Sequence, residues 1–178
     1  VVLFSAADRV WSAYAAGGGV HVRRIAGATA AQEERTVYAG AGPEASIRLL
    51  GAYGTAGRSP WLCFVEDAAG GSTLWIVLHP HVGDGTARAC SVDRDGGTGR
   101  IDAYWVFQES RGFATVVYLR ECVLHGILIS ADGGVHETAM FSATHETVRQ
   151  VDLVTTASGD RVHHEGFYTA RFADGGFV

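Results

Sequence analysis

The residues in this sequence that are best suited to chemistry are its eight histidines, several of which stand close to one another or to a carboxylate. His79 and His81 are two positions apart, so in an extended strand both imidazoles lie on the same side. Two imidazoles placed in this way can hold zinc, iron or another transition metal. His79 and His81 are therefore candidate metal ligands, and the alternative is a strand end with two surface imidazoles. No cofactor is otherwise predicted.

A second group of histidines could act in acid–base catalysis. Glu137 and His145 share one face of a predicted strand, and His164 and Tyr168 share the apolar face of the last predicted strand. A histidine that meets a carboxylate in an apolar cavity can serve as a general base. We therefore predict His164, His145, Glu137 and Tyr168 as catalytic candidates. The alternative is a hydrogen-bonded interior histidine with no role in catalysis.

Aromatic residues form the third candidate set, because they fall on the faces that alternation assigns to the interior. In a barrel of eight or more strands, the interior can hold side chains or one small ligand. A cavity that is lined by aromatic side chains and a few polar groups is a common small-molecule site. In a two-sheet sandwich the same side chains would simply form the core. The predicted ligand-binding residues are Trp75, Trp105, Phe107, Phe141 and Phe172.

The composition excludes several classes of protein. The chain has 178 residues and a net charge of −5, so it lacks the basic excess that a general nucleic-acid binder needs to neutralise phosphates. No apolar run approaches eighteen residues, so no membrane-spanning helix is predicted. The length predicts one domain over 1–178, with 1–19 as an N-terminal segment that precedes the main body.

Cysteine usage favours a reducing, cytoplasmic location. Three cysteines at wide spacing do not form a disulfide framework and are expected to be small buried hydrophobic residues. The sequence begins at Val1, so a processed N-terminus and secretion are the alternative. The sequence contains neither Lys nor Asn, which is typical of a GC-rich genome.

The elements expected to position these residues are short strands separated by turns rich in Gly and Asp. Residues 1–19 are predicted to contain a short helix, because Ala6, Ala7, Val10, Trp11 and Tyr14 have rough helical spacing. Residues 28–35 also look helical. The predicted strands are 20–26, 36–40, 45–53, 60–67, 72–80, 86–92, 100–108, 112–120, 122–131, 135–144, 147–156 and 161–172.

These strands predict an all-β fold, because short connections join neighbouring antiparallel strands into one long meander. Closing a long meander removes its free edges, so an up-and-down β-barrel is expected. A two-sheet sandwich or jelly roll is the alternative. No internal repeat is evident. Strand 122–131 is apolar on both faces, so we expect a covering helix or a homo-oligomer contact there.

A family resemblance is consistent with the barrel. Asp8-Arg9-Val10-Trp11 precedes the long meander, and Arg171 lies near the end of the chain. This arrangement resembles the calycins, the lipocalin-like β-barrels, which have an early Trp and a late Arg packed over it. The resemblance implies an apolar ligand inside the barrel. Some calycins are enzymes that act on polyketide-like or isoprenoid-like substrates.

Three functions remain open from the sequence. The first is a β-barrel that binds a small apolar molecule. The second is a cofactor-independent cyclase or isomerase that uses the same cavity. The third is a structural or protein-interaction domain, such as a viral or assembly component, with no catalytic activity.

Overall fold

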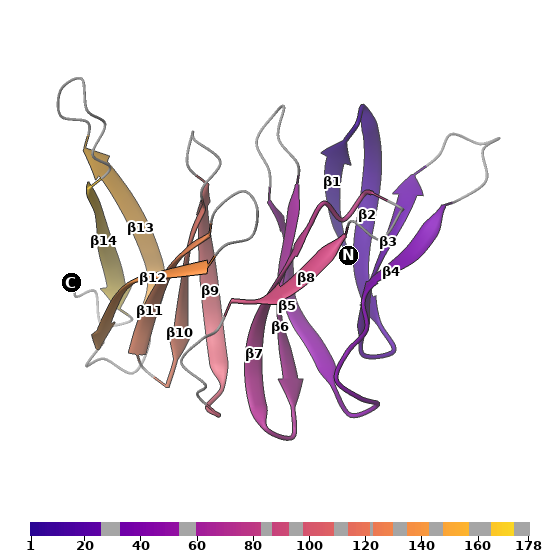
Figure 1. Cartoon of the computed structure of the whole chain (residues 1–178). Helices are drawn as coiled ribbons and strands as arrows, with labels where there is room; N and C mark the ends of the chain where they lie inside the picture. Colours follow the sequence, from indigo (N-terminus) through magenta and orange to yellow (C-terminus); the bar gives the residue numbers. More distant parts are fainter. Residues whose placement is uncertain are drawn as a thin grey trace.

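The computed structural model is built from β-strands, and no helix occurs in the residues it describes (Figure 1). None of the described segments is therefore a helix long and apolar enough to cross a membrane. The described residues are 1–25, 33–53, 60–82, 87–92, 98–108, 114–121, 123–129, 135–142, 148–156 and 165–172.

Four consecutive strands form the first sheet. They pair in chain order, and each pair is antiparallel. The strands are β1 (Val2–Ala6), β2 (Arg9–Ala16), β3 (Gly19–Ile25) and β4 (Glu34–Tyr38).

The helix predicted within residues 1–19 is wrong, because this segment is a β-hairpin. Ala7 and Asp8 adopt positive φ angles of 50° and 57° and reverse the chain between β1 and β2. The buried residues then alternate with a period of two, as Trp11 and Ala13 show. The helix predicted over 28–35 is wrong at its C-terminal end, because Glu34 and Arg35 begin β4. The rest of that range, 28–32, lies outside the described residues.

Two more four-stranded sheets and a hairpin follow, all antiparallel and in chain order. The second sheet contains β5 (Ser46–Tyr53), β6 (Trp61–Ala68), β7 (Gly71–Leu78) and β8 (Arg88–Ser91). The third contains β9 (Ile101–Gln108), β10 (Ala114–Arg120), β11 (Val123–Ile129) and β12 (Val135–Ser142). The hairpin is β13 (Val148–Thr156) with β14 (Glu165–Phe172).

All twelve predicted strands are present, so the all-β prediction is confirmed. The single long meander is not found, because pairing within the described strands stops after β4, β8 and β12. The same four-strand order recurs three times, although the sequence shows no obvious repeat. The described strands form separate sheets and do not close a barrel.

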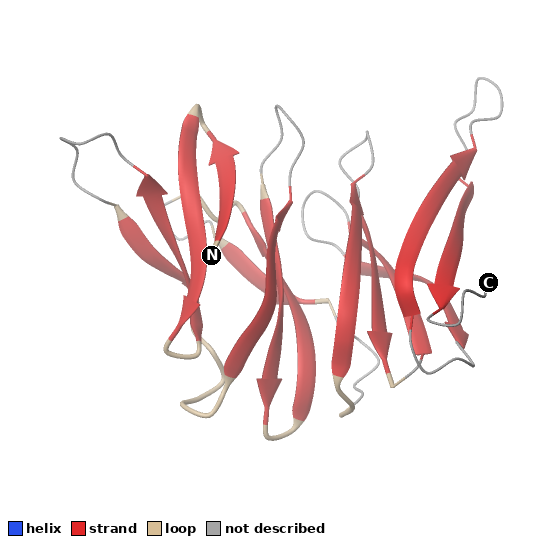
Figure 2. Ribbon diagram, turned by 180° about the vertical axis from the view of Figure 1, so that it is seen from behind, coloured by secondary structure: helices blue, strands red, loops and turns tan. Residues whose placement is uncertain are grey.

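The sheets lie side by side in a row (Figure 2). Their first strands are adjacent, since β1 contacts β5 and β5 contacts β9. The middle sheet packs against a neighbouring sheet on each of its faces. One face packs on the first sheet through a core that includes Phe4, Trp11, Val20, Val22, Phe64 and Val77. The other packs on the third sheet through a core that includes Cys63, Leu74, Ile76, Val116, Tyr118 and Ile127.

A register shift in β9 changes one predicted face. Ile101 pairs with Arg120 and Ala103 with Leu119, so the strand carries an extra residue at Asp102. After this irregularity, Tyr104 and Val106 pack against the core between the second and third sheets. Trp105 therefore lies on the opposite face of the sheet from Tyr104 and pairs with the buried Val117, and its role in ligand binding stays a prediction.

The doubly apolar strand is an inner strand of the third sheet. β11 pairs with β10 on one side and β12 on the other, so both of its edges are already occupied. Ile127 and Ile129 are buried in the core next to the middle sheet. No described helix covers β11. The homo-oligomer contact through this segment remains a prediction.

Candidate functional site

A group of nitrogen donors lies at one end of the interface between the first two sheets. Arg35 stands at the start of β4 and pairs with Val22, so it lies on the side of the sheet that faces the core. Its guanidinium carbon is 5.1 Å from the centre of the Trp11 ring. Its Nη2 donates to the His81 carbonyl oxygen at 2.7 Å and to Glu33 Oε1 at 2.9 Å. We call Trp11, Arg35 and His81 the Arg35 cluster.

Four buried nitrogen atoms of the Arg35 cluster have no hydrogen-bond partner among the described residues. They are Nε and Nη1 of Arg35, Nε1 of Trp11 and Nδ1 of His81. The arginine and indole nitrogens can only donate, and Nδ1 of a histidine donates in one of its two tautomers. A buried donor without an acceptor costs about 1–3 kcal/mol, so such groups are uncommon and call for an explanation.

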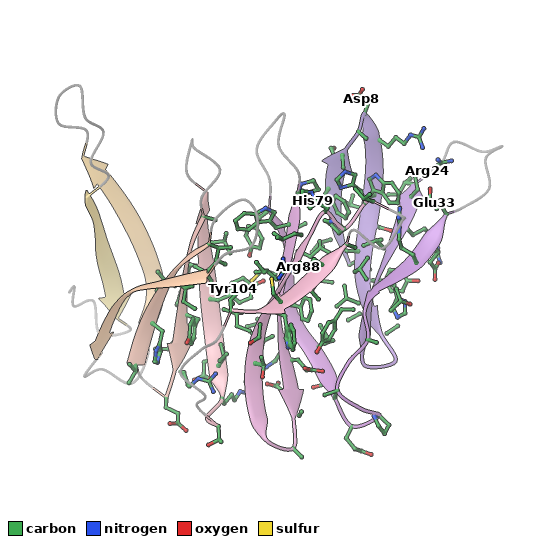
Figure 3. All side chains as sticks on the ribbon, viewed as in Figure 1. Asp8, Arg24, Glu33, His79, Arg88 and Tyr104 are labelled. Atoms are coloured by element: carbon green, nitrogen blue, oxygen red, sulfur yellow. The ribbon has the colours of Figure 1, made fainter. Side chains whose placement is uncertain are left out.

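A tight turn after β7 brings His81 to this position. His79 adopts a positive φ of 50°, and its carbonyl oxygen accepts from the Val82 amide at 3.0 Å. β7 ends at Leu78, so the extended strand on which the His79–His81 metal pair was predicted does not continue through these residues. Figure 3 shows His79 at the same end of the molecule as Arg24 and Glu33.

The charge around the Arg35 cluster is only partly balanced. Glu33 accepts from Arg35 and also lies 3.8 Å from Arg24 Nη1, so one carboxylate faces two guanidinium groups. Burial lowers the pKa of His81, and the charges of His79 and Arg35 lower it further. The imidazole is therefore held in its neutral form, and the positive charge resides on the arginines.

This arrangement is better suited to an anion than to a cation. Guanidinium and indole N–H groups recognise carboxylate, sulfate or phosphate oxygens, and burial strengthens such bonds. A metal ion at His81 would have to lie close to the Arg35 charge. In the described ranges, no group of three or more His, Cys, Asp or Glu side chains is arranged to hold a metal.

A different polar cluster lies farther along the same interface. Glu66 is 4% exposed, and its carboxylate accepts from the Tyr38 hydroxyl at 2.6 Å, the Ala41 amide at 2.7 Å and the Trp75 indole at 3.2 Å. A Cβ at Gly40 would collide with the Gly18 carbonyl, so glycine permits the close approach that precedes Ala41. We call Glu66 and these three donors the Glu66 cluster.

Burial raises the pKa of Tyr38, and its hydrogen bond to Glu66 raises it further. The hydroxyl therefore stays protonated and donates. The Glu66 cluster is complete in itself, which indicates a structural role. Trp75, a predicted ligand-binding residue, packs against Tyr38 here with ring centres 4.9 Å apart.

A third polar cluster joins the second and third sheets. Arg48 donates to both Asp67 oxygens, to Ser72 Oγ and to the Ile101 carbonyl. Burial raises the pKa of Asp67, but hydrogen bonds from Arg48 and Ser72 and nearby positive charge outweigh burial and leave it below its usual value. Arg120 adds bonds to the carbonyls of Gly99, at 2.6 Å, and Ser72, at 3.0 Å.

The remaining predicted site residues are placed only in part. His145 and His164 lie outside the described residues. Glu137 is in β12 and Tyr168 in β14, which belong to different sheets. The backbone places Phe107, Phe141 and Phe172 in β9, β12 and β14. Their side chains, and those of Glu137 and Tyr168, are outside what the structure describes.

A register shift also interrupts β12 near Glu137. Glu137 pairs with Ile127 and Ala139 with Gly126, so the strand has an extra residue at Thr138. The simple alternation that placed Glu137 on one face with Phe141 therefore does not run through this point. Whether Glu137 approaches His145 or His164 stays a prediction.

The sequence identifies Trp11 and His81 as residues of interest but does not identify Arg35. Trp11 was singled out as the Trp that an arginine should cover, and the arginine found over its ring is Arg35. The sequence places Arg35 at the end of the predicted helix over 28–35 and does not mark it as a candidate site residue. Alternation in β4 would have placed it on the core side of the sheet, which is an unusual position for a charged residue.

Comparison with known proteins gives no relative for this chain. No protein-family model matches it, and no match is found among curated proteins or among solved structures.

Proposed function

We propose that this protein binds a small organic anion at the Arg35 cluster. The observation that carries the proposal is the set of four buried nitrogens without a partner in the described part of the chain, three of which can only donate. An oxyanion would supply acceptors to donors that otherwise remain unsatisfied. Binding would therefore recover much of the cost of burying them.

The position of the cluster supports a ligand that enters from solvent. Arg35, Trp11 and His81 lie at or near strand ends, next to the turn at Ala7–Asp8 and the turn at His79–Val82. Binding residues commonly occupy loops and strand ends that a rigid scaffold holds in place. The two sheets supply that scaffold here.

An apolar body on the same ligand is compatible with this site. The Trp11 ring stacks on Phe4 with centres 6.4 Å apart, and both belong to the core between the first two sheets. A molecule with an acidic group and an apolar remainder would match donors at the edge of that core. This keeps the small apolar molecule expected from the sequence, with a charged group added.

For the scaffold, we propose a row of blade-like sheets of the kind that β-propellers use, in preference to a barrel or a sandwich. The support is the recurrence of four consecutive antiparallel strands with the first strand of each sheet next to that of the following sheet. Propeller blades are four-stranded sheets arranged by repetition.

Native mass spectrometry of the purified chain, compared with its denatured mass, tests the proposed function. We expect the wild-type chain to take up small organic acids from a defined mixture, and Arg35→Gln to lose them. The matched control is Arg23→Gln, because Arg23 pairs with Glu34 at 2.6 Å on the exposed face of the same sheet. Uptake by Arg35→Gln at the wild-type level would contradict the proposal.

The same spectra also examine the metal alternative. Extra mass corresponding to a transition metal, lost on replacing His79 or His81 with Ala, would favour the predicted metal pair instead. A bare wild-type chain that takes up no acid at any concentration tested would also contradict the proposed function.

A further inference from the structure

We infer that the Arg35 cluster selects a singly charged carboxylate over a doubly charged phosphate or sulfate. This inference rests on the proposed function, because it names the class of anion that the same site would take. It follows from the number of charges and the kind of donors found at the site.

The charge count near the cluster leaves about one positive charge for a ligand. Arg35 and Arg24 carry two positive charges, and Glu33 carries one negative charge between them. In the described ranges, Glu33 forms the ion pair with Arg35, and Arg24 is linked to Arg35 through the same carboxylate. A carboxylate would neutralise the remaining charge, whereas a dianion would leave a net negative charge in a partly buried place.

Burial makes this difference important. Trp11 is 3% exposed and the Arg35 side chain 17% exposed, so water screens charges weakly here. An uncompensated charge in such surroundings is costly unless it is paired or hydrogen-bonded. The indole N–H of Trp11 is a neutral donor, so it adds a hydrogen bond without adding the second positive charge that phosphate would need.

The number of donors separates a carboxylate from a simple halide. A carboxylate has two oxygens with about four acceptor positions, so it can receive bonds from several donors in different directions. Chloride is also singly charged but offers no oriented acceptors. Chloride therefore serves as a probe for charge alone.

One acidic residue near the site in sequence needs separate treatment. The segments 26–32 and 83–86 flank Arg35 and His81 in the chain and lie outside the described residues, and Asp84 is their only ionisable residue. If the Asp84 carboxylate occupied the cluster, added anions would bind only after its removal. The Asp84→Asn variant distinguishes that case from an open site.

Nuclear magnetic resonance of the Trp11 indole N–H gives a local readout of binding. Replacement of Trp11 with Phe identifies this signal among those of the four Trp residues. Sodium acetate, phosphate, sulfate and chloride are titrated at constant ionic strength and about pH 8, where phosphate carries nearly two charges. We expect acetate to shift the signal in a saturable manner and to bind about tenfold more tightly than phosphate or sulfate, a difference of about 1.4 kcal/mol.

The variants show whether the signal reports the proposed site. Arg35→Gln should abolish the acetate shift, and Arg23→Gln should leave it unchanged. Trp75→Phe removes an indole that already has an acceptor in Glu66, so it should also leave the Trp11 shift intact. Asp84→Asn should leave the acetate affinity within about twofold.

The outcomes separate failure of the inference from failure of the proposed function. Tighter binding of phosphate or sulfate than acetate, with loss in Arg35→Gln, would overturn the carboxylate inference and keep an anion site. Equal shifts with chloride and acetate would overturn it as well, because charge alone would explain them. No saturable shift with any anion would overturn both. A shift that appears only in Asp84→Asn would assign the site to an internal carboxylate and also overturn both.

Discussion

The interface between the first two sheets contains two clusters of buried donors, and they differ in whether an acceptor is present. In the Glu66 cluster a hydroxyl, an amide and an indole all donate to one carboxylate. In the Arg35 cluster an indole, a guanidinium and an imidazole meet no acceptor for four of their nitrogens within the described chain. Arg35 and Tyr38 are three residues apart on β4, about 10 Å along the strand.

This comparison distinguishes a structural group from a binding group. Both clusters are built on the same pair of sheets and contain a tryptophan, so their surroundings are similar. A buried donor that is satisfied from within stabilises the fold, whereas an unsatisfied donor lowers stability until a ligand supplies the acceptor. The Glu66 cluster should therefore affect folding, and the Arg35 cluster should affect ligand binding.

The largest effect is expected from removing the acceptor of the Glu66 cluster. Glu66→Ala leaves one buried and two partly buried donors without their acceptor, so we expect a loss of about 3 kcal/mol in the free energy of unfolding. Urea denaturation followed by tryptophan fluorescence measures this loss. Glu66→Gln retains one carbonyl oxygen and should lose less.

The matched control for this prediction is Glu34→Ala. Glu34 also accepts from a tyrosine hydroxyl at 2.6 Å, that of Tyr14, and pairs with Arg23, but it lies on the exposed face. Its loss should lower stability far less than the loss of Glu66, because water screens the interactions of an exposed carboxylate. Similar losses in the Ala variants of Glu66 and Glu34 would show that burial does not distinguish them.

Replacing Arg35 should reduce ligand affinity far more than fold stability. Arg35→Gln removes the donors of the proposed site, together with the bond to the His81 carbonyl and the contact with Trp11. We expect a loss of about 1–2 kcal/mol in stability without ligand, which is smaller than for Glu66→Ala. Unfolding curves with and without sodium acetate should then coincide for this variant and differ for wild type.

Stabilisation by acetate that is the same in wild type and Arg35→Gln would contradict this expectation, because it would be a general solvent effect. Arg23→Gln provides the comparison for loss of a surface arginine. It should keep the acetate-dependent stabilisation.

The strands could be predicted from the sequence because their signals are local. Alternation of apolar residues and turns such as Asp67-Ala-Ala-Gly-Gly71 mark where each strand begins and ends. The apolar residues of 1–19 predict a helix although the segment forms strands, because a short apolar segment can fit both periods. The turn at Ala7–Asp8, which decides the case, lacks the glycine that usually marks positive φ angles.

The division into sheets could not be predicted in the same way. The connection from β4 to β5 spans only 39–45, which is short enough for a hairpin, yet these strands belong to different sheets. Loop length shows that two strands are near each other but not that they pair. The β-bulges at Asp102 and Thr138 also reverse faces that strict alternation had assigned.

The candidate site depends on contacts between distant segments. Trp11, Arg35 and His81 come from β2, β4 and the turn after β7, and no spacing rule links them. The metal pair at His79 and His81 requires an extended strand through both residues, but β7 ends at Leu78, before either of them. His81 contributes to the candidate site nonetheless, through its carbonyl oxygen and its unpaired Nδ1.

The Arg48–Asp67 cluster extends the comparison to the second interface, where the acceptor is again internal. The pKa of Asp67 lies below its usual value, so its contribution to stability is present above the unfolded-state pKa of 3.8 and is lost as the pH falls through the folded-state pKa. Asp67→Asn should lose about 1 kcal/mol at neutral pH, because the carboxylate is partly exposed. Urea unfolding from about pH 5 to about pH 3 should show a smaller decline for this variant than for wild type. Parallel declines would assign the acid sensitivity to other carboxylates.

The smallest effects, and the sharpest comparison, are expected from the two tryptophans. Phenylalanine keeps an aromatic ring and removes the indole N–H, so it isolates the donor. Trp75→Phe breaks a bond to Glu66 and should cost up to about 1 kcal/mol without changing acetate binding. Trp11→Phe removes a donor that has no acceptor in the described residues, and this gain offsets the packing lost with the smaller ring. Its stability without ligand should therefore change by less than about 0.5 kcal/mol, while its acetate affinity falls. Calorimetric unfolding with and without acetate measures both quantities, and a reversed pattern would mean that Trp11, like Trp75, already has an acceptor within the protein.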